Sequence, residues 1–122
     1  MHYAEGEHGR RQAQEMALRI LSLPERPTAI FAASDIQAVG VLEAARELGL
    51  DVAKDLSIIG YDDIELADIM QLTTVRQMLF ESGKRGVELL LRTLEQPDVE
   101  PAHEYLDVEL IIRETTAPPT QS

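Results

Sequence analysis

Two pairs of polar residues stand out because each directly follows a short apolar run: Ser34 and Asp35, then Asp62 and Asp63. A carboxylate at such a point can accept hydrogen bonds from ligand hydroxyl or amino groups, each contributing roughly 1.5–3 kcal/mol. A structural role is equally open, because Ser and Asp are preferred residues at the start of a helix. Asp35 could cap a helix while Ser34 faces a ligand. Likewise, Asp63 could cap a short helix while Asp62 stays in solvent.

Catalytic and metal chemistry find little support in the sequence. The three histidines, His2, His8 and His103, are scattered and form no metal-ligand pair at helical spacing. Cysteine is absent, and so are a G-x-S-x-G motif and a glycine-rich phosphate loop. A phosphoacceptor site would need a Lys after a neighbouring strand, and no predicted strand is followed by one. We therefore expect no catalytic residues, no bound metal and no cofactor.

The charge balance excludes one class of partner for this chain. Its net charge is -11, from 22 acidic and 11 basic residues. A nucleic-acid backbone is bound by clustered Lys and Arg, so this chain should not bind DNA by itself. No apolar run approaches the roughly 18 residues of a membrane-spanning helix, and no secretory signal pattern follows Met1. We expect a cytoplasmic protein with no membrane contact and an aliphatic core.

The apolar spacing predicts alternating helices and short strands. Helices are expected over 9–21, 36–48 and 80–94, a short helical or irregular stretch over 64–70, and strands over 29–33, 56–61, 72–75 and 103–112.

Details of the pattern place these elements in a sheet. The run 29–33 has no alternation and predicts a strand buried on both faces, whereas in 103–112 the even-numbered residues from Leu106 to Ile112 should point inward. Gly49 suits the left-handed position after a helix. The order predicts an α/β fold with a mainly parallel sheet flanked by helices. Ligands bind such sheets beyond the carboxyl ends of the strands, where both polar pairs lie.

Four segments of the sequence carry a family resemblance. They read PTAIFAASD over 27–35, DLSIIGYDD over 55–63, LTTVRQ over 72–77 and RETTAPP over 113–119. In this order they resemble the signatures of LacI/GalR (lactose- and galactose-repressor-like) bacterial transcription regulators. The last two segments distinguish those regulators from most periplasmic sugar-binding relatives.

The resemblance implies an incomplete C-terminal lobe of a type I periplasmic-binding-protein-like sensor domain. Residues 1–114 would form part of this effector-binding domain, 78–96 a helix that packs on a missing N-terminal lobe, and 115–122 a flexible tail. The implied function is effector sensing and dimerisation in a repressor that responds to a sugar-like metabolite. Operator DNA would be bound only through a helix-turn-helix head absent from this chain. The alternative is a fragment of a periplasmic sugar-binding transport receptor.

The resemblance also assigns effector contacts to four residues. Asp62 matches the family's effector-binding aspartate, and Gln77 matches a glutamine that lines the cleft in some members. Ser34 stands where an asparagine usually contacts sugar hydroxyls; it is shorter and has no amide donor, so the preferred effector should differ. Tyr3 is placed where members have an aromatic residue that packs on the ligand.

Self-association is the remaining expectation. The helix 36–48 resembles the one that builds the family's homodimer interface, so Val39 and Leu42 should be buried between subunits, and Met70 is assigned to the same interface. Without an N-terminal lobe, the helix 80–94 would expose a row of aliphatic side chains, among them Val87, Leu90 and Leu91. Such a row favours association with a second copy.

Overall fold

The computed structural model describes residues 9–120, and these divide into two compact units. Of the described residues, the first unit contains 9–76 and 110–120, and the second is Gln77–Glu109. The stretch 1–114, expected as one partial domain, thus contributes to both units. They are described in turn.

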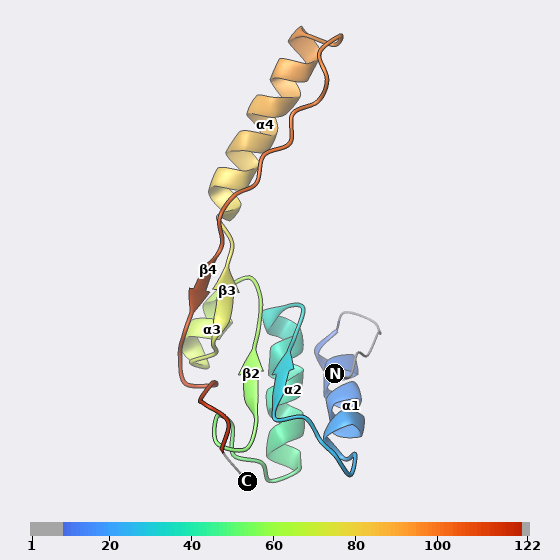
Figure 1. The fold of residues 1–122 in the computed structure, drawn as a ribbon, viewed down its shortest axis with the longest axis vertical. Helices are drawn as coiled ribbons and strands as arrows, with labels where there is room; N and C mark the ends of the chain where they lie inside the picture. Colours follow the sequence, from blue (N-terminus) through green and yellow to red (C-terminus); the bar gives the residue numbers. More distant parts are fainter. Residues whose placement is uncertain (1–8, 121–122) are drawn as a thin grey trace. The chain divides into compact units, whose positions relative to one another are not determined.

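Two helices of the first unit lie side by side (Figure 1). They are α1, Arg10–Leu21, and α2, Asp35–Glu47, close to the predicted ranges. Arg10 forms an ion pair with Glu43 across the two helices, and the Gln14 side-chain amide donates to Glu47 at 3.2 Å. The apolar face of α1 turns inward, because Ala17 and Leu21 are buried.

Local residues set both ends of α2. The Ser34 hydroxyl oxygen accepts a hydrogen bond from the Gln37 N–H at 3.2 Å, which satisfies one unpaired donor of the first turn. At the other end Gly49 has φ +68°, and the Leu50 N–H donates to the Ala45 carbonyl at 2.9 Å. This is the glycine-terminated pattern that was predicted for Gly49.

Four short strands form the sheet arrangement of the first unit. β1, Ala29–Phe31, pairs in parallel with β2, Ser57–Ile59. β3, Thr74–Arg76, joins β2 through parallel bridges, Ile59 to Thr73 and Asp62 to Arg76. β4, Glu109–Ile111, whose residues 110 and 111 belong to the first unit, pairs with β3. The α/β prediction with mainly parallel strands is therefore confirmed.

The core is aliphatic, as the scarcity of aromatic residues predicted. It lies between α1, α2, β2 and the short helix α3, Glu65–Ile69. Ile58 of β2, fully buried, is at its centre. Its members are small or branched side chains: Ala17, Leu21, Ala32, Ala38, Val41, Ala44, Ala45, Leu56, Ile58, Ala67 and Leu72.

The prediction that 29–33 is buried on both faces is wrong. Ala29 is exposed, Ile30 is half-buried, and Phe31 is 66% exposed. The cause is positional: Ile30 is in register with the buried Ile58, whereas Phe31 points to the opposite face because strand side chains alternate. Within the described part of the chain, the core covers only the first of these faces.

The predicted long strand over 103–112 is also wrong in extent and orientation. Only Glu109–Ile111 is a strand, since β3, the edge that pairs with it, is itself three residues long. Val108, Leu110 and Ile112, expected to point inward, are 55%, 55% and 72% exposed. Alternation alone therefore did not identify a covered face.

The expected flexible tail is ordered at its start. Thr115 is 4% exposed; its hydroxyl donates to the Ile58 carbonyl at 2.7 Å and accepts from the Thr73 N–H at 2.9 Å. The Ser57 hydroxyl likewise donates to the Ala117 carbonyl at 3.1 Å. Because these contacts satisfy backbone groups of two neighbouring strands, residues 115–117 belong to the folded unit, and the prediction of a flexible tail is wrong for them.

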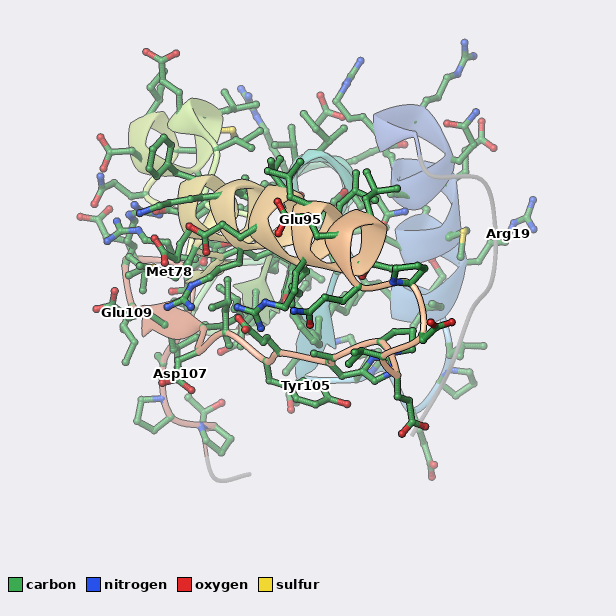
Figure 2. The ribbon with its side chains drawn as sticks, turned by 90° about the horizontal axis from the view of Figure 1, so that it is seen from above. Arg19, Met78, Glu95, Tyr105, Asp107 and Glu109 are labelled. Atoms are coloured by element: carbon green, nitrogen blue, oxygen red, sulfur yellow. The ribbon has the colours of Figure 1, made fainter. Side chains whose placement is uncertain are left out.

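The second unit consists of α4, Leu79–Glu95, and the segment that returns beside it through Tyr105 and Asp107 (Figures 1 and 2). Arg85 of α4 contacts Glu104 of that segment at 3.7 Å. No α4 residue is buried, and its apolar side chains Val87, Leu90, Leu91 and Leu94 are 54–69% exposed. No helix in residues 9–120 has the length and apolar character needed to cross a membrane.

Candidate functional site

The polar pairs that follow β1 and β2 meet at one edge of the sheet. The Asp35 N–H donates to the Tyr61 carbonyl at 2.8 Å, which brings the segment containing Ser34 next to the loop containing Asp62. Parallel pairing of the two strands places both carboxyl ends on the same side. The predicted convergence of Ser34 and Asp62 at this edge therefore has direct structural support.

Asp35 is the buried centre of this edge. Its side chain is enclosed at 1% exposure; Oδ1 accepts from the Thr74 hydroxyl at 2.6 Å and Oδ2 from the Ile64 N–H at 2.9 Å. A buried carboxylate is tolerated only when it is hydrogen-bonded in this way. Asp35 thus connects the end of β1, the loop after β2 and β3.

Gly60, the residue before Tyr61, has to be a glycine because the Asp35 carboxylate lies so close to it. A β-carbon at Gly60 would collide with Oδ1 of Asp35 and lie 3.0 Å from the Leu72 side chain. The backbone of β2 can therefore approach the Asp35 carboxylate only because residue 60 has no side chain.

Of the two residues that could cap α2, Ser34 does so. Asp35 is the first residue of the helix, and its side chain is buried. The capping bond uses the hydroxyl oxygen of Ser34 as an acceptor. A hydroxyl can accept and donate at the same time, so the half-buried Ser34 can cap the helix and donate to a ligand.

The loop that carries Asp62 has an unusual backbone. Asp62 has φ +116° and Asp63 has φ +55°, and both lie where residues with a side chain are rarely found. The Asp62 N–H donates to the Val75 carbonyl at 2.9 Å, which fixes the loop to β3. The half-buried Asp62 is therefore held in a defined position at the strand ends.

Asp63 makes two ion pairs. Its Oδ2 lies 2.7 Å from Nε of Arg76, and its Oδ1 lies 2.8 Å from Nη2 of Arg113. The α3 cap position is Ile64, with no side-chain capping bond, so of the two interpretations left open for Asp63 the capping role does not apply. Burial raises the pKa of Asp63, but the hydrogen bonds and charges of Arg76 and Arg113 outweigh it and hold the pKa below its ordinary value.

Of the remaining two predicted ligand contacts, Gln77 and Tyr3, the structure describes only Gln77. Gln77 is half-buried and is the first residue of the second unit, directly after Arg76. Tyr3 lies outside the described residues. No cluster of His, Asp or Glu able to hold a metal ion occurs among residues 9–120.

The residues predicted for a dimer interface differ in exposure. Val39 is only 8% exposed within the single chain and has little surface left for a partner. Leu42 is half-buried against the core, and Met70 is 37% exposed. Of the three, Leu42 and Met70 keep apolar surface for a second copy.

Sequence reasoning missed the contribution of Thr74 and Arg113. Thr74 was recognised only as part of a strand motif, and Arg113 only as part of the segment RETTAPP. Arg113 is 10% exposed and donates from Nη1 to the Leu72 carbonyl at 2.9 Å. Because Arg113 directly follows the predicted strand 103–112, a carboxylate partner could have been expected for it. Asp63 lies far from it in the sequence, so nothing local identifies Asp63 as that partner.

The fold and this strand-end edge define a periplasmic binding protein-like domain. The model of that domain family matches residues 1–116, so the chain belongs to it. Its curated relatives include the HTH-type transcriptional repressor CytR of Escherichia coli (strain K12), 42% identical over 80% of this chain and 29% of that protein. The ribose operon repressor of Haemophilus influenzae is 41% identical over 79% of this chain and 30% of that protein.

Solved structures agree with this assignment. The dimeric Lac repressor with an 11-residue C-terminal deletion is 34% identical with a TM-score of 0.83, covering 95% of this chain and 43% of that chain. A LacI-family regulator from Enterococcus faecium with bound ribose is 30% identical with a TM-score of 0.79, covering 93% and 42%. The predicted resemblance to LacI-family regulators is confirmed, and the chain spans under half the length of these relatives.

The ion pairs of Asp63 predict a specific dependence of stability on acid. Because its folded-state pKa lies below the ordinary value of about 3.9, the stabilisation is complete above that pH and is lost as pH falls through the folded-state pKa. Asp63→Asn should lower the free energy of unfolding at neutral pH by about 2 kcal/mol and flatten its decline below about pH 4. Urea unfolding across pH measures both effects.

The control for that experiment is Asp98→Asn, a neutralised carboxylate at an exposed position of the second unit. It should leave the neutral-pH stability and the acid decline as they are in the unchanged chain. If the free energy of unfolding of Asp63→Asn falls below about pH 4 as steeply as that of the control, the ion pairs of Asp63 are not the cause of the fall.

Proposed function

We propose that this chain is the effector-sensing part of a LacI-type transcription regulator and has no catalytic role. The observation that carries the proposal is the position of Ser34 and Asp62 at the carboxyl ends of adjacent parallel strands, whose following segments are joined by the Asp35 N–H to Tyr61 carbonyl bond, in a domain of this family. That is the place where open α/β sheets bind small ligands. A ligand that binds one conformation better than another shifts the population of the two, and thereby regulates a distant site.

The regulator role is supported by the relatives and by the charge. The relatives named above are transcriptional repressors, which does not favour a transport receptor. Net charge -11 opposes contact between this chain and a phosphate backbone, so operator DNA would be bound by another part of the regulator. A transcription regulator acts on the chromosome, and the proposal therefore includes a cytoplasmic location.

The chemistry of the edge favours a sugar-like effector. Asp62 offers carboxylate oxygens as acceptors and Ser34 offers a hydroxyl donor, a combination that suits adjacent hydroxyl groups. Two related regulators, 30% and 33% identical to this chain, have structures with bound ribose. Gln77 and Tyr3 are proposed as additional effector contacts.

Ribose should shift the amide resonances of residues 34 and 62 in a proton–nitrogen correlation spectrum of the chain. One lobe gives weak binding, so the titration should extend to the order of tens of millimolar. Asp62→Asn should weaken binding about tenfold, because Asn tolerates positive φ but loses the charged acceptor.

The Asp98→Asn variant should bind ribose as the unchanged chain does. Absence of ribose-dependent shifts at residues 34 and 62, or equal binding by Asp62→Asn, would contradict the proposed contact.

Self-association is proposed to accompany this role. The lac repressor relative has a structure described as dimeric, and Leu42 and Met70 are proposed for a corresponding interface. The apolar row on α4 (Val87, Leu90, Leu91 and Leu94) adds a second contact, since covering each such side chain contributes roughly 1.5–3 kcal/mol.

Light scattering at tens of micromolar should therefore give a mass above that of one chain. Leu90→Glu combined with Leu94→Glu should reduce this mass, because both side chains lie one turn apart on the apolar row. Arg92→Glu is the matched control: it changes the net charge by the same amount but leaves the apolar row intact. A monomeric unchanged chain with α4 folded would contradict self-association.

A further inference from the structure

The conformation of the loop at residues 62 and 63 needs an explanation. Two successive residues with side chains, Asp62 and Asp63, have positive φ, a backbone conformation that is unfavourable for residues with a β-carbon. A strained conformation of this kind persists only when surrounding contacts determine it. The contacts on both sides of Asp62 therefore identify what holds it in place.

On one side the loop is held through Asp35. The Asp35 N–H binds the Tyr61 carbonyl, and its carboxylate binds the Ile64 N–H, so the residues at both ends of the 61–64 turn contact one buried group. These contacts fix where the turn begins and ends. They do not fix the two peptides inside it.

On the other side Asp63 is held by a cationic clamp, defined here as Arg76 and Arg113. Each carboxylate oxygen of Asp63 contacts one of the two arginines, at 2.7 and 2.8 Å. Arg113 is itself fixed, because its second terminal nitrogen donates to the Leu72 carbonyl at 2.9 Å. With side-chain exposures of 8% for Asp63 and 10% for Arg113, this ion pair is weakly screened by solvent.

The clamp also has a distinct place in the chain. Arg76 is the last residue before the second unit, and Arg113 follows shortly after the chain returns at Leu110. Both chain segments that lead to and from the second unit are thus anchored to the residue next to Asp62.

We infer that Asp63 is a positioning residue: through Arg76 and Arg113 it holds Asp62 in the left-handed conformation that presents its carboxylate. The inference rests on the proposed function for the role of Asp62 as an effector contact. It assigns Asp63 no contact with the effector.

Hydrogen exchange of individual amides tests the inference without any ligand. In Asp63→Asn the Asp62 N–H, which is bonded to Val75, should exchange at least about tenfold faster than in the unchanged chain. Two reference amides, Ile58 bonded to Thr115 and Leu48 bonded to Ala44, report the loss of global stability, and the Asp62 amide should accelerate at least about tenfold more than either of them. Asn keeps the tolerance for positive φ, so only the ion pairs are removed.

A merely structural role gives a different result. If all three amides accelerate by the same factor, Asp63 stabilises only the whole fold and does not position Asp62. If the Asp62 amide keeps its rate, the clamp does not hold the loop. Either result overturns the inference.

Arg76→Gln is the milder variant, since Arg76 is 46% exposed, and it serves if Asp63→Asn does not fold. It should accelerate the Asp62 amide about threefold more than the two reference amides. The double variant should match Asp63→Asn alone, because both changes remove the same contact. The clamp would be contradicted if the two substitutions had additive effects on the exchange rate of the Asp62 amide, or if Arg76→Gln did not change that rate.

A ribose titration of the same variants separates the two proposals. Weaker ribose binding by Asp63→Asn, together with faster exchange at Asp62, supports the inference. Ribose binding equal to that of the unchanged chain overturns it. If the unchanged chain shows no response to ribose, the proposed ribose effector fails, while the exchange experiment still decides whether Asp63 positions Asp62.

Discussion

The arrangement of this protein depends on the buried carboxylate of Asp35. It lies directly after the first strand, yet it binds the Thr74 hydroxyl of β3 and the Ile64 N–H after β2. A charged group with 1% exposure is stable only while both partners remain in place, because each lost partner leaves a charge without solvation. One side chain therefore assembles the ends of three strands into a single edge, which gives the candidate site its shape.

The remaining features of the edge follow from this centre. Gly60 lets β2 approach the carboxylate, and the turn after Tyr61 is pinned at both ends, leaving Asp62 and Asp63 in a strained conformation. The arginines that bind Asp63 offset that strain. In the proposed site, the buried Asp35 fixes the strand ends, and the ion-paired Asp63 is proposed to hold the turn so that Asp62 can contact a ligand.

The sequence predicted the fold class, the helices and the convergence of Ser34 with Asp62, because helical periodicity and strand-end position are local signals. It did not predict that Ser34 caps α2 while Asp35 is buried, since both residue types suit either role. Partners distant in sequence, such as Thr74 for Asp35 and Arg113 for Asp63, have no local signature. The exposure of Phe31 and the ordering of Thr115 were missed for the same reason: burial depends on which elements pack together.

A double-mutant cycle between Asp35 and Thr74 tests the central claim most directly. Urea unfolding would be measured for the unchanged chain, Asp35→Asn, Thr74→Val and the double variant, with Thr74→Ser as the control that keeps the hydroxyl. If Asp35 assembles the edge through this bond, the two single losses should be non-additive by at least about 1 kcal/mol, with Thr74→Ser close to the unchanged chain. Additive losses would contradict the account, because Asp35 would then stabilise the strand ends independently of Thr74.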